Sequence, residues 1–111
     1  MCAILFTNID RIRTNQFLES LKLMSYRGPD ASGFFNKNNS KLGHNRLKIQ
    51  DLNDRGNQPF SSQNKRYICI FNGEIYNYKK LALEHNIELK TTCDTELLVE
   101  LFVMHGEKML T

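Results

Sequence analysis

The chain begins Met1-Cys2-Ala3-Ile4-Leu5-Phe6, and the last four of these residues form a continuous apolar run. Such a run is typical of a strand buried on both faces, so we predict a first strand over residues 2–7. Removal of Met1 would leave Cys2 with a free α-amine, which is partly unprotonated near neutral pH and can accept the thiol proton. Cys2 could equally be a small apolar residue of the core. These six residues leave both roles open.

The composition is that of an ordinary globular domain. The chain has 111 residues, of which 41% are apolar and 24% are charged, and its net charge is +3. This length suits one domain. The basic residues are dispersed, so we expect no nucleic-acid partner. No apolar run approaches the ~20 residues that span a bilayer, and the first residues do not form a signal-like segment. We therefore expect no membrane partner and a cytoplasmic location.

The cysteines and histidines follow no metal-binding or disulfide pattern. The three cysteines, Cys2, Cys69 and Cys93, are odd in number and widely spaced. An odd number without close pairs argues against a disulfide scaffold. The three histidines show no zinc-ligand spacing. We therefore expect no metal site.

The apolar pattern predicts strands over residues 2–7, 33–35, 42–49 and 67–71, and helices over residues 14–25, 77–85 and 94–106. The expected N-caps are Thr14, Asn77 and Asp94, and Gly28-Pro29 and Gly106 are the expected helix ends. Polar residues 36–41 predict a hairpin turn, and residues 87–91 a short extended piece. Residues 51–64 are predicted to form a long loop, a candidate moving cover for a site.

Five short segments carry residues suited to chemistry. They are Cys2; Arg27-Gly28-Pro29-Asp30 with Gly33; Leu42-Gly43-His44-Asn45-Arg46-Leu47 with Ile49; Asn72-Gly73-Glu74-Ile75-Tyr76-Asn77; and Asp94-Thr95-Glu96. Each segment alone has an ordinary structural explanation. Asn-Gly after a strand, for example, commonly forms a plain turn.

In this order and spacing, the five segments resemble the N-terminal glutaminase domain of the class II glutamine amidotransferases. Among these proteins, the chain is most similar to the glutamine-hydrolysing asparagine synthetases. The resemblance runs from Cys2 to about Gly106. It implies an α+β fold, the αββα sandwich of the N-terminal-nucleophile hydrolases, with residues 1–111 forming the N-terminal portion of the domain and lacking its later strands. No segment resembles the pyrophosphate loop of a synthetase, so ATP and magnesium would belong to an absent synthetase domain, and glutamine hydrolysis itself needs no cofactor.

The resemblance assigns catalytic roles to three residues. Cys2 would be the nucleophile that attacks the side-chain amide of glutamine. Asn72 and Gly73 would donate hydrogen bonds to the oxyanion, Asn72 from its side-chain amide and Gly73 from its backbone N–H. A glycine suits that role because it lets the backbone approach a ligand closely.

The resemblance also assigns substrate binding to five residues. Arg46 would bind the α-carboxylate of glutamine, because a guanidinium matches a carboxylate with paired donors. Glu74 and Asp94 would bind the α-ammonium, and backbone groups around Leu47 and Ile49 would contact the substrate. A surface arginine is the alternative for Arg46, and a helix N-cap is the alternative for Asp94.

Other residues near these segments receive structural predictions. Arg27 could orient Cys2 or form an ion pair with Asp30, and both alternatives stay open. His44 is expected to be structural. Cys93 is expected to be a spectator thiol near the pocket, and Cys69 a core residue.

The predicted function is hydrolysis of glutamine by an N-terminal cysteine, with ammonia delivered to a synthetase such as asparagine synthetase. One alternative is a glutamine-binding fragment or subunit with little or no activity. Another is an amidotransferase of sugar or cell-surface polysaccharide synthesis. The partners expected are glutamine, a synthetase or complementing chain, and a second copy of the chain. Self-association is expected because an apolar sheet face would otherwise lack its cover.

Overall fold

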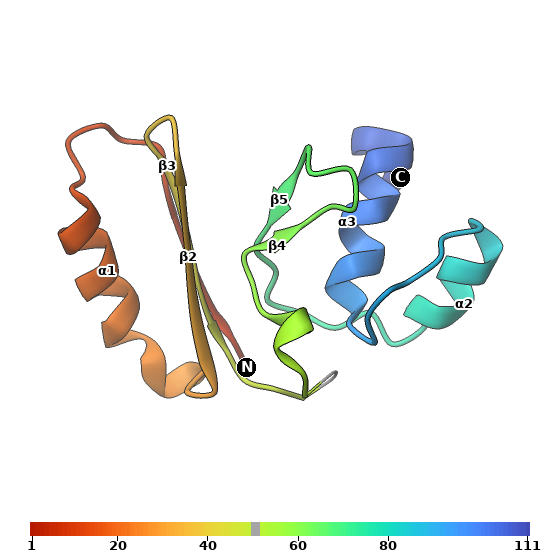
Figure 1. Cartoon of the computed structure of the whole chain (residues 1–111), viewed down its shortest axis with the longest axis horizontal. Helices are drawn as coiled ribbons and strands as arrows, with labels where there is room; N and C mark the ends of the chain where they lie inside the picture. Colours follow the sequence, from red (N-terminus) through yellow and green to blue (C-terminus); the bar gives the residue numbers. More distant parts are fainter. Residues whose placement is uncertain (50–51) are drawn as a thin grey trace.

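The computed structural model describes residues 1–49 and 52–111, and its elements lie in layers (Figure 1). The strands are β1 Ala3–Thr7, β2 Ala31–Lys37, β3 Ser40–Arg46, β4 Phe60–Ser61 and β5 Ile68–Cys69. The α-helices are α1 Thr14–Leu23, α2 Tyr78–Glu84 and α3 Asp94–His105, and the 3₁₀ helices are η1 Ser25–Arg27, η2 Asp54–Gly56 and η3 Gly106–Leu110. Helix α1 lies on one side of the larger sheet, and β4, β5 and α3 lie on the other. The predicted α+β class is confirmed. No helix in the described ranges is long and apolar enough to cross a membrane.

The larger sheet is antiparallel, with β3 between β1 and β2. Gly43 of β3 pairs with Leu5 of β1 and with Phe34 of β2. The hairpin between β2 and β3 turns at Asn38 and Asn39, whose φ angles are +49° and +67°. Asparagine tolerates this left-handed region better than most residues. The hairpin turn predicted from the polar run is therefore confirmed.

Helix α1 packs on this sheet through Phe17 and Leu21, each 2% exposed. Gly43 allows the close approach, because a Cβ there would stand 2.9 Å from Leu21 Cδ2 and 3.0 Å from Phe17 Cε1. Thr14 is not the N-cap as predicted but the first helical residue. The N-cap is Arg13, whose backbone N–H donates to Gln16 Oε1 over 3.0 Å.

Strand β1 is not buried on both faces, as its apolar run predicted. Ile4 is 44% exposed and Phe6 is 56% exposed. Alternate residues of a strand face opposite sides. Leu5 shares the α1 side with Gly43, so Ile4 and Phe6 point to the side that faces the smaller sheet. They stay partly open there because β1 is an edge strand.

The smaller sheet pairs two short strands. One comes from the segment predicted to be a loop, and the other from a segment predicted to be a strand. Phe60 of β4 pairs with Cys69 of β5, and Ser61 pairs with Ile68. The predicted strand over 67–71 is therefore shorter, because its partner supplies only two paired residues. The predicted loop over 51–64 is wrong where it is described, since it contains η2, β4 and the buried Ser62. Asp51 lies outside the described residues.

Helix α3 begins at Asp94, the residue predicted to be its N-cap. Cys93 is the N-cap, so Asp94 is the first helical residue and does not cap α3. Asn77 does occupy the N-cap position of α2, although its side chain makes no capping hydrogen bond. The chain before α3 is held by buried Glu96, whose Oε2 accepts the backbone N–H and the hydroxyl of Thr91, each over 2.7 Å. Residues 87–91 form no strand in the described structure.

Candidate active site

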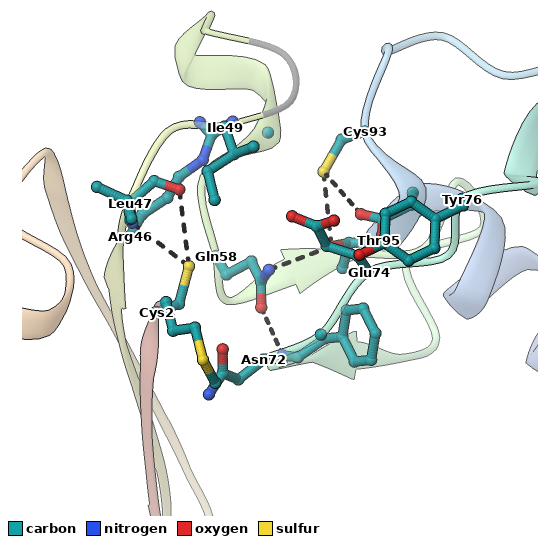
Figure 2. A pocket seen from close by; sticks show the side chains of 15 residues that line it. Cys2, Arg46, Leu47, Ile49, Gln58, Asn72, Glu74, Tyr76, Cys93 and Thr95 are labelled. Atoms are coloured by element: carbon teal, nitrogen blue, oxygen red, sulfur yellow. Dashed lines mark hydrogen bonds between the residues drawn. The ribbon is translucent and has the colours of Figure 1, made fainter.

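One pocket, with a volume of about 340 Å³, brings together every residue that the sequence placed in the site. Its lining includes Cys2, Arg46, Leu47, Ile49, Asn72, Gly73, Glu74 and Asp94. Figure 2 shows Cys2 and Leu47 from the large-sheet side on one flank, and Glu74, Cys93 and Thr95 on the other. Residues as far apart in the sequence as Cys2 and Thr95 therefore share one cavity. This convergence is the central observation about the site.

Cys2 lies just before β1 and beside the end of β3. Its Sγ accepts the backbone N–H of Leu47 over 3.3 Å and lies 3.8 Å from the Leu47 carbonyl oxygen, to which the thiol donates (Figure 2). An N–H donor aimed at sulfur stabilises developing negative charge there. The pairing of β1 with β3 sets this contact, because Ala3 pairs with Asn45. Met1 also lines the pocket, so its removal would change the pocket mouth as well as free the amine.

Arg46 is the last residue of β3 and is only 5% exposed. Its Nη1 donates to the Asn53 carbonyl over 2.8 Å and to Asn57 Oδ1 over 2.7 Å. These contacts fix the guanidinium at the pocket wall. The alternative of a surface arginine is wrong, because the side chain is buried and is held by the η2 turn.

Asn72 and Gly73 come shortly after the end of β5, and both line the pocket. The preceding residue, Phe71, is anchored through its backbone N–H, which donates to Gln58 Oε1 over 2.6 Å. At position 73 a Cβ would stand 2.7 Å from the Phe71 ring. A side chain there would force that ring to move, so glycine lets the Phe71 ring pack against the turn.

Two carboxylates, Glu74 and Asp94, line the opposite flank. Asp94 is 5% exposed, and its Oδ2 accepts the backbone N–H of Ile75 over 2.7 Å. This bond ties the start of α3 to the turn that carries Glu74. The nearby carboxylate of Glu74 raises the pKa of Tyr76. The two carboxylates make this flank the electronegative side of the pocket.

The structure adds pocket residues that the sequence reasoning did not select. They are Met1, Gly56, Gln58, Phe71, Tyr76, Cys93 and Thr95, of which Cys93 had been expected near the pocket. Gln58 was missed because a glutamine inside a polar segment resembles solvent-exposed loop. The glycine two residues before it and the proline after it were the available signals, since they mark a constrained backbone.

Several highlighted residues lie outside the pocket. Arg27 is exposed and, within residues 1–49 and 52–111, forms no ion pair with Asp30. Asp30 instead accepts the backbone N–H of Lys48 over 2.8 Å. The predicted ion pair is therefore wrong, and in the described part of the chain Arg27 forms no hydrogen bond with Cys2. Cys69 is half-buried rather than fully buried, and burial raises its pKa to about 11.

His44 is fully buried between the two sheets and does not line the pocket. In the described part of the chain, neither ring nitrogen makes a hydrogen bond of ordinary geometry. Burial lowers the pKa of His44 to about 4, the nearby backbone of Phe71 opposes this shift, and the charge of Arg46 adds to it. The imidazole is therefore neutral near pH 7, as a structural histidine requires.

Within the described residues, the site offers no cluster of metal ligands. Among residues 1–49 and 52–111, no group of three or more His, Cys, Asp or Glu side chains could hold a metal ion. The described pocket offers two thiols, the hydroxyl groups of Tyr76 and Thr95, amide and backbone donors, one guanidinium and two carboxylates.

The family model for the glutamine amidotransferase domain matches residues 1–111. The chain belongs to this family. The amidotransferase chain is 43% identical over 93 residues to a probable glutamine-hydrolysing asparagine synthetase of Acanthamoeba polyphaga mimivirus, covering 80% of this chain and 17% of that protein. It is 39% identical over 95 residues to asparagine synthetase B of Escherichia coli, covering 84% and 17%. It is also 37% identical over 91 residues to amidase chry2 of Gibberella zeae, covering 78% and 14%.

The amidotransferase chain thus spans less than a fifth of the length of these three relatives. Each of the three matches covers at least 78% of this chain. The resemblance predicted from the five segments is confirmed at the level of the family.

Proposed function

We propose that the chain hydrolyses the side-chain amide of glutamine, with Cys2 as the nucleophile and with the ammonia passed to a synthetase site such as that of an asparagine synthetase. The observation that carries this proposal is the pocket that gathers a thiol, candidate oxyanion donors, a guanidinium and two carboxylates. The thiol and the oxyanion donors suit the side-chain amide of glutamine, the guanidinium suits its α-carboxylate, and the two carboxylates suit its α-ammonium. The proposal includes the N-terminal-nucleophile hydrolase fold and removal of Met1.

The reaction begins when the free α-amine of Cys2 takes the thiol proton. The sulfur attacks the amide carbon, and the π electrons of the carbonyl move to its oxygen. Asn72 and Gly73 donate to that oxyanion, an interaction whose loss typically costs ~3–4 kcal/mol of barrier. The intermediate collapses, the carbon–nitrogen bond breaks, and the protonated amine delivers its proton to the leaving ammonia. Water then attacks the thioester and releases glutamate and the thiol.

The substrate orientation follows from the charges on the two flanks. The α-carboxylate of glutamine faces Arg46, and its α-ammonium faces Glu74 and Asp94. These pairs hold the substrate so that its amide carbon lies near Cys2 Sγ. Holding the reactants together in this way lowers the entropic part of the barrier. No metal or cofactor takes part in this half-reaction.

A partner polypeptide is part of the proposal. Ammonia needs an acceptor site, which this chain does not contain in the residues described. A synthetase supplies it, either as a further domain or as a separate chain. The partly exposed Ile4 and Phe6 on the edge strand support contact with another polypeptide or with a second copy.

The test is glutamate release from glutamine by the purified chain, compared with Cys2→Ala and with Cys69→Ala as a matched control. Cys69 lies outside the pocket, so its variant is expected to keep the wild-type rate. Cys2→Ala is expected to release glutamate at least 1000-fold more slowly. Equal release from wild type and Cys2→Ala would refute the mechanism. Mass analysis of the intact chain shows whether Met1 has been removed.

A further inference from the structure

Gln58 uses both ends of its side-chain amide inside the pocket. Its Oε1 accepts the backbone N–H of Phe71 over 2.6 Å, and its Nε2 donates to Thr95 Oγ1 over 3.1 Å. The residue is 7% exposed and Thr95 is 1% exposed, so water does not compete freely for these bonds. Figure 2 shows the Gln58 side chain between the Cys2 flank and the Thr95 flank.

The two hydrogen bonds reach the two segments on which the proposed reaction depends. Phe71 immediately precedes Asn72, a proposed oxyanion donor. Thr95 immediately follows Asp94, a proposed partner of the substrate ammonium. One neutral side chain therefore connects the backbone of the oxyanion segment to the first turn of α3.

The backbone of Gln58 is itself fixed against the large sheet. At Gly33 of β2, an added Cβ would collide with the Gln58 carbonyl oxygen and stand 3.0 Å from Pro59 Cδ. Two residues before Gln58, Gly56 lies against the guanidinium of Arg46. The Gln58 side chain thus extends from a backbone position that is packed against the larger sheet. Arg46 is the last residue of β3 in this sheet, and Cys2 immediately precedes β1.

We propose that Gln58 is a positioning residue that sets the separation between the Cys2–Arg46 flank and the flank that carries Asn72 and Asp94. This inference rests on the proposed glutaminase function but concerns a residue with no direct part in its chemistry. Catalytic donors must lie within about 0.5 Å of their productive positions. A side chain that spans the pocket and bonds both segments provides that constraint.

The first test compares Gln58→Met with Gln63→Met. Methionine keeps the length and volume of glutamine but makes neither hydrogen bond. Gln63 is the matched control, because it belongs to the same segment and donates to Glu96 and to the Glu88 carbonyl, outside the pocket. Gln58→Met is expected to lower kcat/KM about 10- to 100-fold, and Gln63→Met less than 3-fold, at a temperature where both variants are folded.

A second variant separates positioning from general stability through its pH profile. In Gln58→Glu, the protonated carboxyl group accepts from Phe71 and donates to Thr95, as the amide does. The ionised form places a negative charge beside Asp94 and the developing oxyanion. The ratio of variant to wild-type kcat/KM is therefore expected to rise at least 10-fold between pH 8 and pH 5. A ratio that does not change with pH would overturn the proposal.

Amide hydrogen exchange tests the inference without relying on activity. Gln58→Met is expected to accelerate exchange in residues 70–73 and 93–96, while Gln63→Met, which loses a contact with Glu96, leaves residues 70–73 as in wild type. Unchanged exchange in both segments would overturn the positioning role even if glutamine were hydrolysed. If the wild-type chain releases no glutamate but the two variants show the expected differences in exchange, the proposed function alone is refuted.

Discussion

The guanidinium of Arg46 packs against Gly56, where a Cβ would stand 2.5 Å from Nη2 and 3.0 Å from Cζ. On the other side of the same group, Nη1 donates to the Asn53 carbonyl and to Asn57 Oδ1. A single turn of chain, η2 with its flanking residues, therefore determines where the cationic group lies. Under the proposed function, binding of the glutamine carboxylate would therefore depend on Gly56, a residue without a side chain.

Replacing Gly56 with alanine should displace the Arg46 guanidinium from its place in the pocket. A shift of a few tenths of an ångström weakens a bidentate contact with a carboxylate. We expect KM for glutamine to rise about 10-fold with kcat changed less than 3-fold, measured by glutamate release. Arg55→Ala, a change in the neighbouring residue that donates to the Lys90 carbonyl, is the control and should leave KM unchanged. An unaltered KM in Gly56→Ala would contradict the role of Arg46.

Asn72→Ala should remove one proposed oxyanion donor without disturbing substrate binding. An interaction made mainly in the transition state affects kcat rather than KM. We expect kcat to fall about 100- to 1000-fold with KM within 3-fold of wild type. Asn36→Ala on the exposed part of β2 is the control and should keep the wild-type kcat. A large rise in KM with little loss of kcat would instead assign Asn72 to substrate binding.

His44 should make the stability of the chain depend on pH. Its pKa is about 4 in the folded chain, against 6.5 for an unperturbed histidine, so protonation favours the unfolded state. The contribution of neutral His44 is present above pH 6.5 and is lost as the pH falls toward 4, by at most about 3 kcal/mol. Urea unfolding of wild type and His44→Leu between pH 7 and pH 4.5 measures it.

The difference in unfolding free energy between these two proteins is expected to shift against wild type by about 1.4 kcal/mol per pH unit below pH 6. Comparing the two proteins cancels the carboxylates that titrate in both. His85→Gln, a change in a half-buried histidine that packs against His105, should show the wild-type pH dependence. A constant difference between wild type and His44→Leu would show that His44 is not held neutral by burial.

Phe6 on edge strand β1 should promote self-association of the isolated chain. Exposed apolar edge strands tend to pair with other chains, and a charge at such a position opposes this. Sedimentation velocity at tens of micromolar is expected to show oligomers for wild type and a shift toward monomer for Phe6→Lys. Leu83→Lys, at a 79% exposed position on α2, should behave as wild type. A monomeric wild-type chain would refute the prediction.

Local sequence patterns predicted most element positions but not their ends. The helix over α1 and the hairpin turn at Asn38-Asn39 follow from short-range signals, namely apolar periodicity and residues that tolerate positive φ. The N-caps expected at Thr14 and Asp94 each lie one residue too late, because backbone geometry at a helix start depends on the contacts of the preceding chain. Strand β5 is short because its partner, β4, offers only two residues for pairing.

The candidate site was predicted more completely than the fold around it. All the residues predicted to act in catalysis or substrate binding line the pocket, although long stretches of chain separate their segments. Their order and spacing match a family, and the family pattern carries tertiary information that periodicity does not. Gln58 and Thr95 were not selected as site residues, since a hydrogen bond between side chains 37 residues apart leaves no sign of the pairing in either local stretch.

Because chemical identity is local, the residue types of the site are written in the chain: a thiol after Met1, an Asn-Gly pair, one arginine and two carboxylates in family order. Their contacts are set by folding. Folding brings Cys2 Sγ to the Leu47 N–H, places Arg46 against Gly56 and Asn57, and leaves Ile4 and Phe6 partly exposed. These outcomes depend on strand pairing and on the approach of distant segments, whose free energy is shared among many contacts rather than encoded in any one stretch.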